Sequence, residues 1–171
     1  PAMPFANGFA GFGNFIKIFT TDEFYSALWV SLKWVVALVL LQLIFGMIVA
    51  LILNQNFKGR GFFRALVFVP WAMSGVLTAV LFSLIYNQNY GVLNDLLMNI
   101  GLIKEPVAWL GNQHIVLGSV IVAELWRGIP FFAISLLAAM QGLSQDVYEA
   151  AKVDGATKWQ SFRFVTLPLL K

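Results

Sequence analysis

Residues 27–53 read ALWVSLKWVVALVLLQLIFGMIVALIL and contain a single charged side chain, that of Lys33. A helix of about 20 apolar residues crosses the roughly 30 Å hydrocarbon core of a bilayer, and this stretch exceeds that length. Apolar side chains surround the predicted helix, whereas a helix on the surface of a soluble domain keeps a polar face. We therefore predict a transmembrane helix, in which Gln42 and Gly46 favour close packing against another helix.

Residues 62–86 and 115–140 have the same apolar character. The complete chain of 171 residues is 60% hydrophobic and 11% charged, with a mean hydropathy of +0.80. About a quarter of the residues of an ordinary soluble domain are charged. The fold class that we predict is an all-α membrane protein that contacts the lipid bilayer, with three transmembrane helices over residues 27–53, 62–86 and 115–140.

Basic residues next to the spans set the predicted orientation, because loops rich in Lys and Arg stay in the cytoplasm. Residues 54–64 and residues 141–171 hold the basic clusters and are predicted to be cytoplasmic, whereas residues 87–114 are predicted to be extracytoplasmic. The chain would then start outside and end inside. An outside N-terminus without a cleavable signal, and an end just after a Leu-Pro pair, lead us to expect further sequence beyond both ends. The clustered basic residues are Lys58, Arg60, Arg64, Lys152, Lys158, Arg163 and Lys171.

Several classes of site are excluded by composition. The chain has no cysteine, which excludes disulfides, thiolate metal sites and cysteine nucleophiles. His114 is the only histidine, so no second imidazole can complete a metal site with it. No glycine-rich phosphate loop ending in Gly-Lys-Ser/Thr is present, so ATP would have to bind to another chain. We predict no catalytic residue, no metal site, no cofactor and no nucleic-acid partner.

The stretch from residue 148 to residue 168 reads YEAAKVDGATKWQSFRFVTLP. Glu-Ala-Ala is followed by three residues, a glycine, nine residues, an aliphatic residue, one residue and Leu-Pro. This pattern resembles the EAA loop of bacterial importer permeases, although Val165 stands where isoleucine is commoner. Further residues are similar to the branch of that family that imports oligosaccharides and related carbohydrates, of the maltose and glycerol-phosphate type. They are Trp126, Pro130, Phe131, Leu143, Tyr148, Asp154-Gly155-Ala156 and Trp159-Gln160-Ser161-Phe162.

The resemblance implies a permease subunit of an ATP-driven, binding-protein-dependent ABC importer. Such a subunit moves a carbohydrate across the cytoplasmic membrane of a bacterium or archaeon by alternating access. Three of its six core helices would lie in this chain. The implied partners are a second homologous permease, two ATP-binding cassette subunits that hydrolyse the ATP, and an extracytoplasmic solute-binding protein.

The resemblance also implies roles for single residues. Glu149 would pair with a basic residue of a cassette subunit, and Ala150, Ala151 and Gly155 would shape the contact. The outer connection, residues 87–114, is our candidate for contact with the binding protein on position alone, and its apolar residues 93–102 could lie along the membrane interface.

Elementary rules for helix ends predict a cytoplasmic helix-turn-helix coupling element over residues 141–168. Asp146 is a candidate cap of the first helix. Gly155 permits a sharp turn, residues 158–164 form a second short helix, and Pro168 limits it. The alternative is an amphipathic helix whose lysines face anionic headgroups at the membrane surface.

Glu124 and Arg127 lie three residues apart in the third predicted span and therefore share one helix face. A single charge at the centre of a membrane helix costs about 2.5–3.5 kcal/mol on insertion scales. The two side chains, with Trp126, are candidates to line the pathway and to hydrogen-bond or stack on a sugar. They are equally candidates for a mutually neutralising pair that fixes helix packing. Pro130 predicts a bend beside them, which could serve gating or be a static kink.

Trp71, Ser74 and Thr78 recur at helical spacing in the second predicted span, and Ser83 and Asn87 follow toward its outer end. Together they are a candidate polar stripe along the substrate pathway. The alternative is a set of small residues that allow close helix packing, with hydroxyls bonded to their own backbone.

Other functions stay open. The same machinery could carry another solute, such as a polyol or glycerol phosphate. Outside the ABC transporters, the chain could be a membrane scaffold, or a proton-coupled carrier with Glu124 as its relay.

Overall fold

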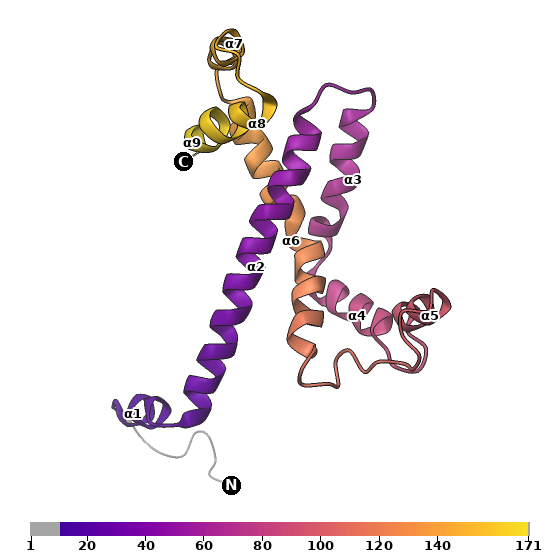
Figure 1. The fold of residues 1–171 in the computed structure, drawn as a ribbon. Coiled ribbons are helices and arrows are strands. Elements are labelled where there is room, and N and C mark those ends of the chain that lie inside the picture. The colour runs from indigo at the N-terminus through magenta and orange to yellow at the C-terminus, as the bar shows by residue number, and fades with distance from the viewer. Residues whose placement is uncertain (1–10, 171) are drawn as a thin grey trace. The chain divides into compact units, whose positions relative to one another are not determined.

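The computed structural model describes residues 11–170 (Figure 1). Two parts of the orientation prediction are not covered by the described residues. They are the N-terminus, which we expect on the extracytoplasmic side, and Lys171 of the predicted cytoplasmic tail. The chain divides into two compact units, residues 1–37 and residues 38–171, and the boundary falls inside helix α2, Asp22–Asn54.

The first unit contains helix α1, Gly13–Phe19, and the start of α2. Two acidic residues in the first turn of α2 lie at the positive end of its dipole and stabilise the helix start. Phe24 packs edge-on against the rings of Phe19 and Tyr25. The Tyr25 hydroxyl donates to the Phe19 carbonyl at 3.0 Å. Contacts between residues close in sequence therefore fix the turn between the two helices.

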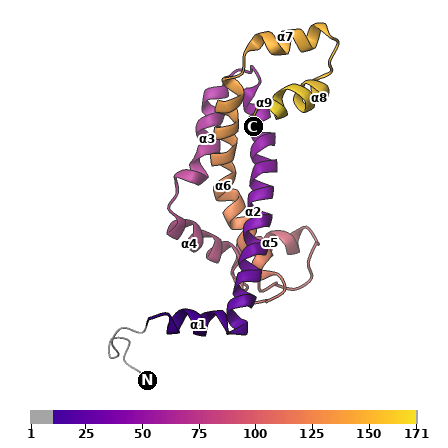
Figure 2. The same ribbon diagram turned by 90° about the vertical axis from the view of Figure 1, so that its left-hand side faces the viewer.

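The second unit contains the rest of α2 and the remaining helices (Figure 2). Regular secondary structure in residues 11–170 is entirely helical, which confirms the predicted all-α fold class. Helices α2 and α6 cover the first and third predicted spans, and each is long and apolar enough to cross a membrane. The elements are α3 (Arg60–Ala72), α4 (Gly75–Ile85), α5 (Val92–Asn99), α6 (Val116–Gln141), α7 (Gln145–Val153), α8 (Lys158–Ser161), a π-helical turn (Phe162–Thr166) and α9 (Leu167–Leu169).

The prediction of one continuous helix over residues 62–86 is wrong. Helices α3 and α4 meet at an angle of 89°, so this segment is at most one broken span. Pro70 lies inside α3, where its ring removes a backbone donor. Met73 and Ser74 are extended, and the Ser74 hydroxyl accepts from the Leu77 N–H at 3.2 Å. Because this hydroxyl caps a new helix start, the chain turns here instead of continuing.

Helix α6 packs closely against the C-terminal half of α2 because glycines lie at the contact. A Cβ atom on Gly46 would lie 2.6 Å from the Cβ of Phe132, and one on Gly128 would overlap the amide nitrogen of Gln42. The Gln42 amide is itself buried and donates to the Glu124 carbonyl at 3.2 Å. The predicted packing role of Gln42 and Gly46 is confirmed.

A buried asparagine organises the outer connection between α4 and α6. Asn94, on α5, is 2% exposed. Its amide nitrogen donates to the Val107 carbonyl at 3.0 Å, and its Oδ1 accepts from the Val107 N–H at 3.2 Å and from Trp109 Nε1 at 2.9 Å. The amide nitrogen of Asn94 also lies 3.4 Å from the Asn87 carbonyl oxygen and 3.3 Å from the Gln88 carbonyl oxygen. The apolar stretch predicted over residues 93–102 is thus a short helix tied to its loop by one polar side chain.

The predicted helix-turn-helix near the C-terminus is present, with two corrections. Ser144, not Asp146, caps α7, because its hydroxyl accepts from the Asp146 N–H at 3.3 Å. The second helical stretch does not end before Pro168 but continues through α9, helped by the wider π-helical turn that precedes the proline. Gly155 has φ +78°, as the predicted sharp turn requires.

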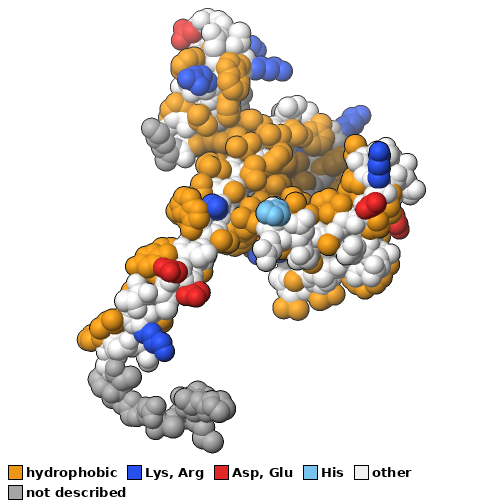
Figure 3. All heavy atoms as spheres, turned by 60° about the horizontal axis from the view of Figure 1, so that its bottom comes forward, with side chains coloured by type: hydrophobic (Ala, Val, Ile, Leu, Met, Phe, Trp, Pro, Cys, Tyr) orange, Lys and Arg blue, Asp and Glu red, His pale blue; other side chains and the backbone are white. Residues whose placement is uncertain are grey.

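Large hydrophobic side chains are exposed along the helices of the second unit. In Figure 3 they cover most of the central part of the visible face. Examples are Phe45 on α2, Leu66 on α3, Val76 on α4 and Val122 on α6. Such surfaces suit lipid or neighbouring membrane helices.

Candidate functional site

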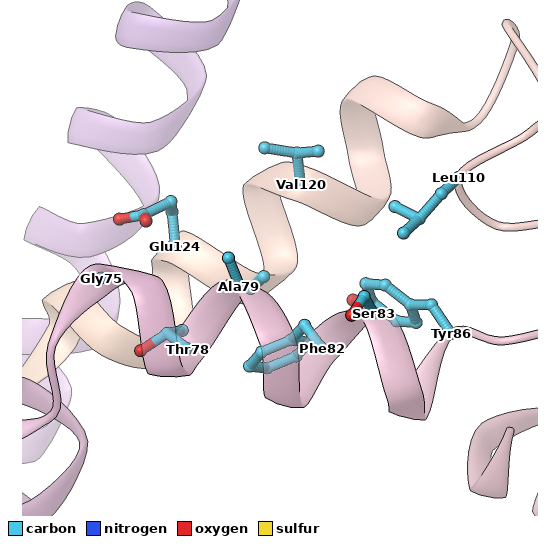
Figure 4. Close-up of a pocket in the computed structure, with 10 residues that line it drawn as sticks. Gly75, Thr78, Ala79, Phe82, Ser83, Tyr86, Leu110, Val120 and Glu124 are labelled. Carbon is cyan, nitrogen blue, oxygen red and sulfur yellow. The ribbon is translucent and has the colours of Figure 1, made fainter.

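A cavity of about 210 Å³ lies between α4 and α6 (Figure 4). Most of its lining is apolar, and Glu124 is the one charged residue in that lining. The cavity exists because α4 turns away from α3 and runs beside α6, with the outer connection closing one end. Its lining residues are Gly75, Thr78, Ala79, Phe82, Ser83, Tyr86, Leu110, Val120, Ala123 and Glu124.

Glu124 and Arg127 form an ion pair within α6. Arg127 Nη2 lies 3.0 Å and Nε 3.2 Å from Glu124 Oε2, so the guanidinium holds one carboxylate oxygen with two donors. The Arg127 and Glu124 side chains are 34% and 29% exposed. Each charge has its partner on the same helix, so the pair is neutral as a unit. The pair does not itself join α6 to another described helix.

Two aromatic rings at the end of α4, those of Phe82 and Tyr86, line the cavity. Trp126 packs edge-on against Phe82, with ring centroids 5.6 Å apart, and keeps 37% of its surface exposed. The Tyr86 hydroxyl donates to the Ser119 carbonyl at 3.1 Å, which ties the end of α4 to α6. An apolar wall with a carboxylate at one edge can stack on the faces of a sugar ring and accept hydrogen bonds from its hydroxyls.

The candidate pathway residues do not form one stripe. Thr78 and Glu124 line the cavity together, and Trp126 contacts its wall through Phe82. Trp71 lies on α3, beyond the 89° break, and stacks on Phe131 with ring centroids 6.3 Å apart. The helical spacing of Trp71, Ser74 and Thr78 in the sequence therefore has no counterpart in the structure.

The hydroxyls and the amide of the predicted stripe are bonded locally. Ser74 caps α4, and the Thr78 hydroxyl donates to the Ser74 carbonyl at 3.2 Å. Asn87 lies after α4, where its Oδ1 accepts from the N–H groups of Asn89 and Tyr90 and shapes the turn. For these three positions the structure has the local bonding that the alternative interpretation describes.

The candidate docking residues lie on α7 and on the turn that follows it. Glu149 and Ala150 are exposed, and Ala151 is half-buried. Gln145 Nε2 donates to Glu149 Oε1 at 3.1 Å, which holds the carboxylate along the helix surface. A groove of about 450 Å³ lies beside them. Its lining residues are Met140, Gln141, Leu143, Gln145, Tyr148, Glu149 and Lys152.

Sequence reasoning missed two polar contacts that shape these regions. The buried amide of Asn94 fixes the outer connection, and nothing in the sequence distinguishes it from Asn99 in the same apolar stretch. The Tyr148 hydroxyl and the Thr166 Oγ1 lie 3.1 Å apart, although both residues were noted only as parts of a motif. Residues 11–170 contain no cluster of three or more potential metal ligands among His, Cys, Asp and Glu.

Residues 42–171 match the family of the binding-protein-dependent transport system inner membrane component. A trehalose/maltose transport system permease protein of Thermococcus litoralis is 39% identical over 163 residues, which are 95% of this chain and 55% of that protein. A lactose transport system permease protein of Rhizobium radiobacter is 34% identical over 164 residues, again 95% of this chain and 55% of the relative. The chain thus spans about half the length of the curated relatives it matches.

Solved structures agree with the sequence matches. A bacterial ABC transporter that imports the acidic polysaccharide alginate matches with a TM-score of 0.85 and 30% identity, over 97% of this chain and 58% of that one. A structure of a bacterial alginate ABC transporter in complex with a periplasmic protein bound to alginate pentasaccharide matches with a TM-score of 0.83 and 28% identity, over 94% of this chain and 56% of that one.

Proposed function

Because the chain belongs to the family of inner membrane components of binding-protein-dependent transport systems, we propose that it forms part of the permease subunit of an ATP-driven carbohydrate importer. The observation that carries the proposal is the exposed docking helix α7, with Glu149, Ala150 and Ala151 on its surface and the positive-φ Gly155 at its end. This shape supports insertion into a groove of a separate ATPase subunit. The hydrolysis of ATP is assigned to that subunit.

The cavity beside α6 supports a carbohydrate as the cargo. Its rings, Phe82, Tyr86 and the neighbouring Trp126, offer stacking surfaces, and Glu124 offers an acceptor. At about 210 Å³ it is smaller than most ligand pockets, which measure about 300–1,000 Å³, so other spans and a partner permease would complete it. Several relatives carry trehalose, maltose or lactose in their names, which supports the same class of cargo.

The charge of the cavity favours a neutral oligosaccharide over a phosphorylated solute. Arg127 is the only cation on α4 or α6, and Glu124 already occupies two of its donors. A phosphate on the remaining donors of Arg127 would lie close to the Glu124 carboxylate, whose like charge repels it. Glycerol phosphate is therefore the second candidate and a neutral sugar the first.

The proposed assembly contains a second homologous permease, two ATP-binding cassette subunits and an extracytoplasmic solute-binding protein. We assign α7 to the cytoplasmic face and the outer connection around α5 to the extracytoplasmic face, where a binding protein would approach. Figures 1 and 2 draw these two segments at opposite ends of the second unit, as this arrangement needs. Basic residues at the start of α3 and after α6 support the same orientation.

Reconstitution tests the proposal. The full-length protein, co-expressed with its partner permease and cassette subunits, is placed in proteoliposomes with the cognate binding protein. We expect maltose or lactose, but not glycerol 3-phosphate, to raise ATP hydrolysis and to be taken up. Uptake that persists without the cassette subunits and collapses in Glu124→Gln would identify a proton-coupled carrier instead. A scaffold would show neither stimulated hydrolysis nor uptake.

A further inference from the structure

The docking helix α7 is joined to the segment after it by a hydrogen bond between two side-chain hydroxyls. The Tyr148 hydroxyl and Thr166 Oγ1 lie 3.1 Å apart, and the two residues are 18 positions apart in sequence. Thr166 is 5% exposed. Its hydroxyl also lies 3.4 Å from the Ser161 carbonyl. Since each hydroxyl donates one proton, Thr166 can donate to Ser161 while it accepts from Tyr148.

The backbone around Thr166 departs from a regular helix. Thr166 ends the π-helical turn Phe162–Thr166, and its hydroxyl reaches the carbonyl five residues back instead of four. Such turns are rare and occur frequently at functional sites. The extra residue in the turn places Thr166 against α7. Among residues 11–170, the Tyr148 contact is the one side-chain hydrogen bond between α7 and the segment from α8 to α9.

Thr166 connects the docking helix with the ends of two long helices. Tyr148 directly precedes Glu149 on α7. On the other side, the Leu170 N–H donates to the Thr166 carbonyl at 3.1 Å, and Leu170 packs on the buried core formed by the ends of α2 and α6. That core consists of Ala50, Leu53, Leu137 and Met140.

Close packing does not replace this contact. A cavity of about 480 Å³ separates α7 from the ends of α2 and α6 in this region. Tyr148 and Thr166 both line it, together with Leu51 and Asn54 of α2 and Met140 of α6. A displacement of α7 can therefore reach Thr166 and the core through the hydroxyl pair at the edge of this cavity.

We propose that Tyr148 and Thr166 are positioning residues for energy coupling, whose hydrogen bond transmits a displacement of the docked α7 to the ends of α2 and α6. Docking itself belongs to Glu149 and its neighbours. This inference rests on the proposed function, because it requires a cassette subunit that moves α7.

Matched variants separate the hydrogen bond from packing. Thr166→Val keeps the shape and removes the hydroxyl, Thr166→Ser keeps the hydroxyl, and Tyr148→Phe removes only the phenolic oxygen. Each is made in the full-length protein and reconstituted with its partner subunits and binding protein. The measurements are co-purification of the cassette subunits and the number of sugar molecules taken up per ATP hydrolysed. The probe is whichever of maltose, lactose and glycerol 3-phosphate the wild-type complex transports fastest.

We expect Thr166→Val and Tyr148→Phe to lower uptake per ATP about two- to tenfold, the range expected for one neutral hydrogen bond. Co-purification should stay at the wild-type level, Thr166→Ser should transport normally, and the double variant should be no worse than either single one. If Tyr148→Phe and Thr166→Val took up as much sugar per ATP as the wild type, this inference would be overturned and the proposed function would stand. The same holds if the losses of the two variants were additive, or if co-purification of the cassette subunits fell as much as uptake per ATP. A wild-type complex without ATP-driven uptake would overturn the proposed function and this inference with it.

Discussion

The docking segment, residues 141–170, and the cavity between α4 and α6 are built by different means. In the docking segment, contacts between near neighbours set the shape: Ser144 caps α7, and Thr157 and Gln160 form a reciprocal capping box at the start of α8. The cavity is assembled from α4, α6 and the outer connection, which are distant in sequence. Its polar groups are mostly bonded within their own helix, as Thr78 and Glu124 show. Local contacts therefore set the starts of α7 and α8, whereas packing between distant segments forms the cavity.

Glu149→Lys should have the largest effect and should act on the docking segment alone. In the proposed assembly Glu149 faces a cassette subunit, and loss of one partner of an interfacial charge pair costs about 2–5 kcal/mol. Co-purification of the cassette subunits and sugar uptake should fall by roughly 30-fold or more.

Glu23→Lys is the matched control, because it makes the same charge change on an exposed residue in the first turn of α2, outside both proposed docking regions. Normal uptake after Glu149→Lys would contradict the docking role and favour a scaffold.

Gly128→Ala tests the packing beside the cavity. The new methyl group would overlap the Gln42 amide, so that side chain must shift and lose its hydrogen bond to the Glu124 carbonyl. Overpacking of this kind costs about 1–3 kcal/mol, measurable as a lower thermal stability of the detergent-solubilised protein.

Gly118→Ala, on the same helix, is its control. No atom lies within 4 Å of the position of its Cβ, and the better helix propensity of alanine should raise stability by at most about 1 kcal/mol. If both variants lowered the thermal stability equally, the loss would come from replacing a glycine in the helix and not from the contact with Gln42.

Glu124→Gln leaves Arg127 without its charged partner at the edge of the cavity. We expect uptake of a neutral sugar to fall about three- to tenfold, because a partly buried cation then competes for the remaining acceptors. Co-purification of the cassette subunits should not change, which separates this variant from Glu149→Lys.

Glu23→Gln, which removes an exposed carboxylate from the first turn of α2, provides the comparison for Glu124→Gln. Unchanged sugar uptake in Glu124→Gln would assign the ion pair to helix stability and remove it from the pathway.

Ser144→Ala should have the smallest effect. Loss of the cap destabilises the start of α7 by about 0.5–2 kcal/mol, but docking would restore part of the helix. Sugar uptake should fall about twofold in Ser144→Ala. The control is Ser135→Ala, which makes the same change on the exposed face of α6 and should leave uptake unchanged. A loss as large as that of Glu149→Lys would mean that the docking segment also depends on more than its local contacts.

Several features of this protein could be predicted from the sequence. Two long apolar stretches gave α2 and α6, because a membrane helix satisfies its own backbone and needs only length and apolar side chains. The turn at Gly155 and the two short helical stretches after α6 followed from cap and turn chemistry, which acts over a few residues. The EAA-like spacing pointed to the family for the same reason: its residues lie in one continuous stretch.

Only the tertiary structure decided how these pieces meet. The break at Met73 and Ser74 turns α4 by 89°, so that Thr78 and Glu124 line one cavity while Trp71 stacks on Phe131. The hydrogen bond between Tyr148 and Thr166 depends on a π-helical turn that no short-range pattern indicates. The burial of Asn94 depends on the return of the chain at Val107. Each of these arrangements depends on residues that belong to different elements of the chain. Local propensity acts over a few residues and does not determine which elements come together.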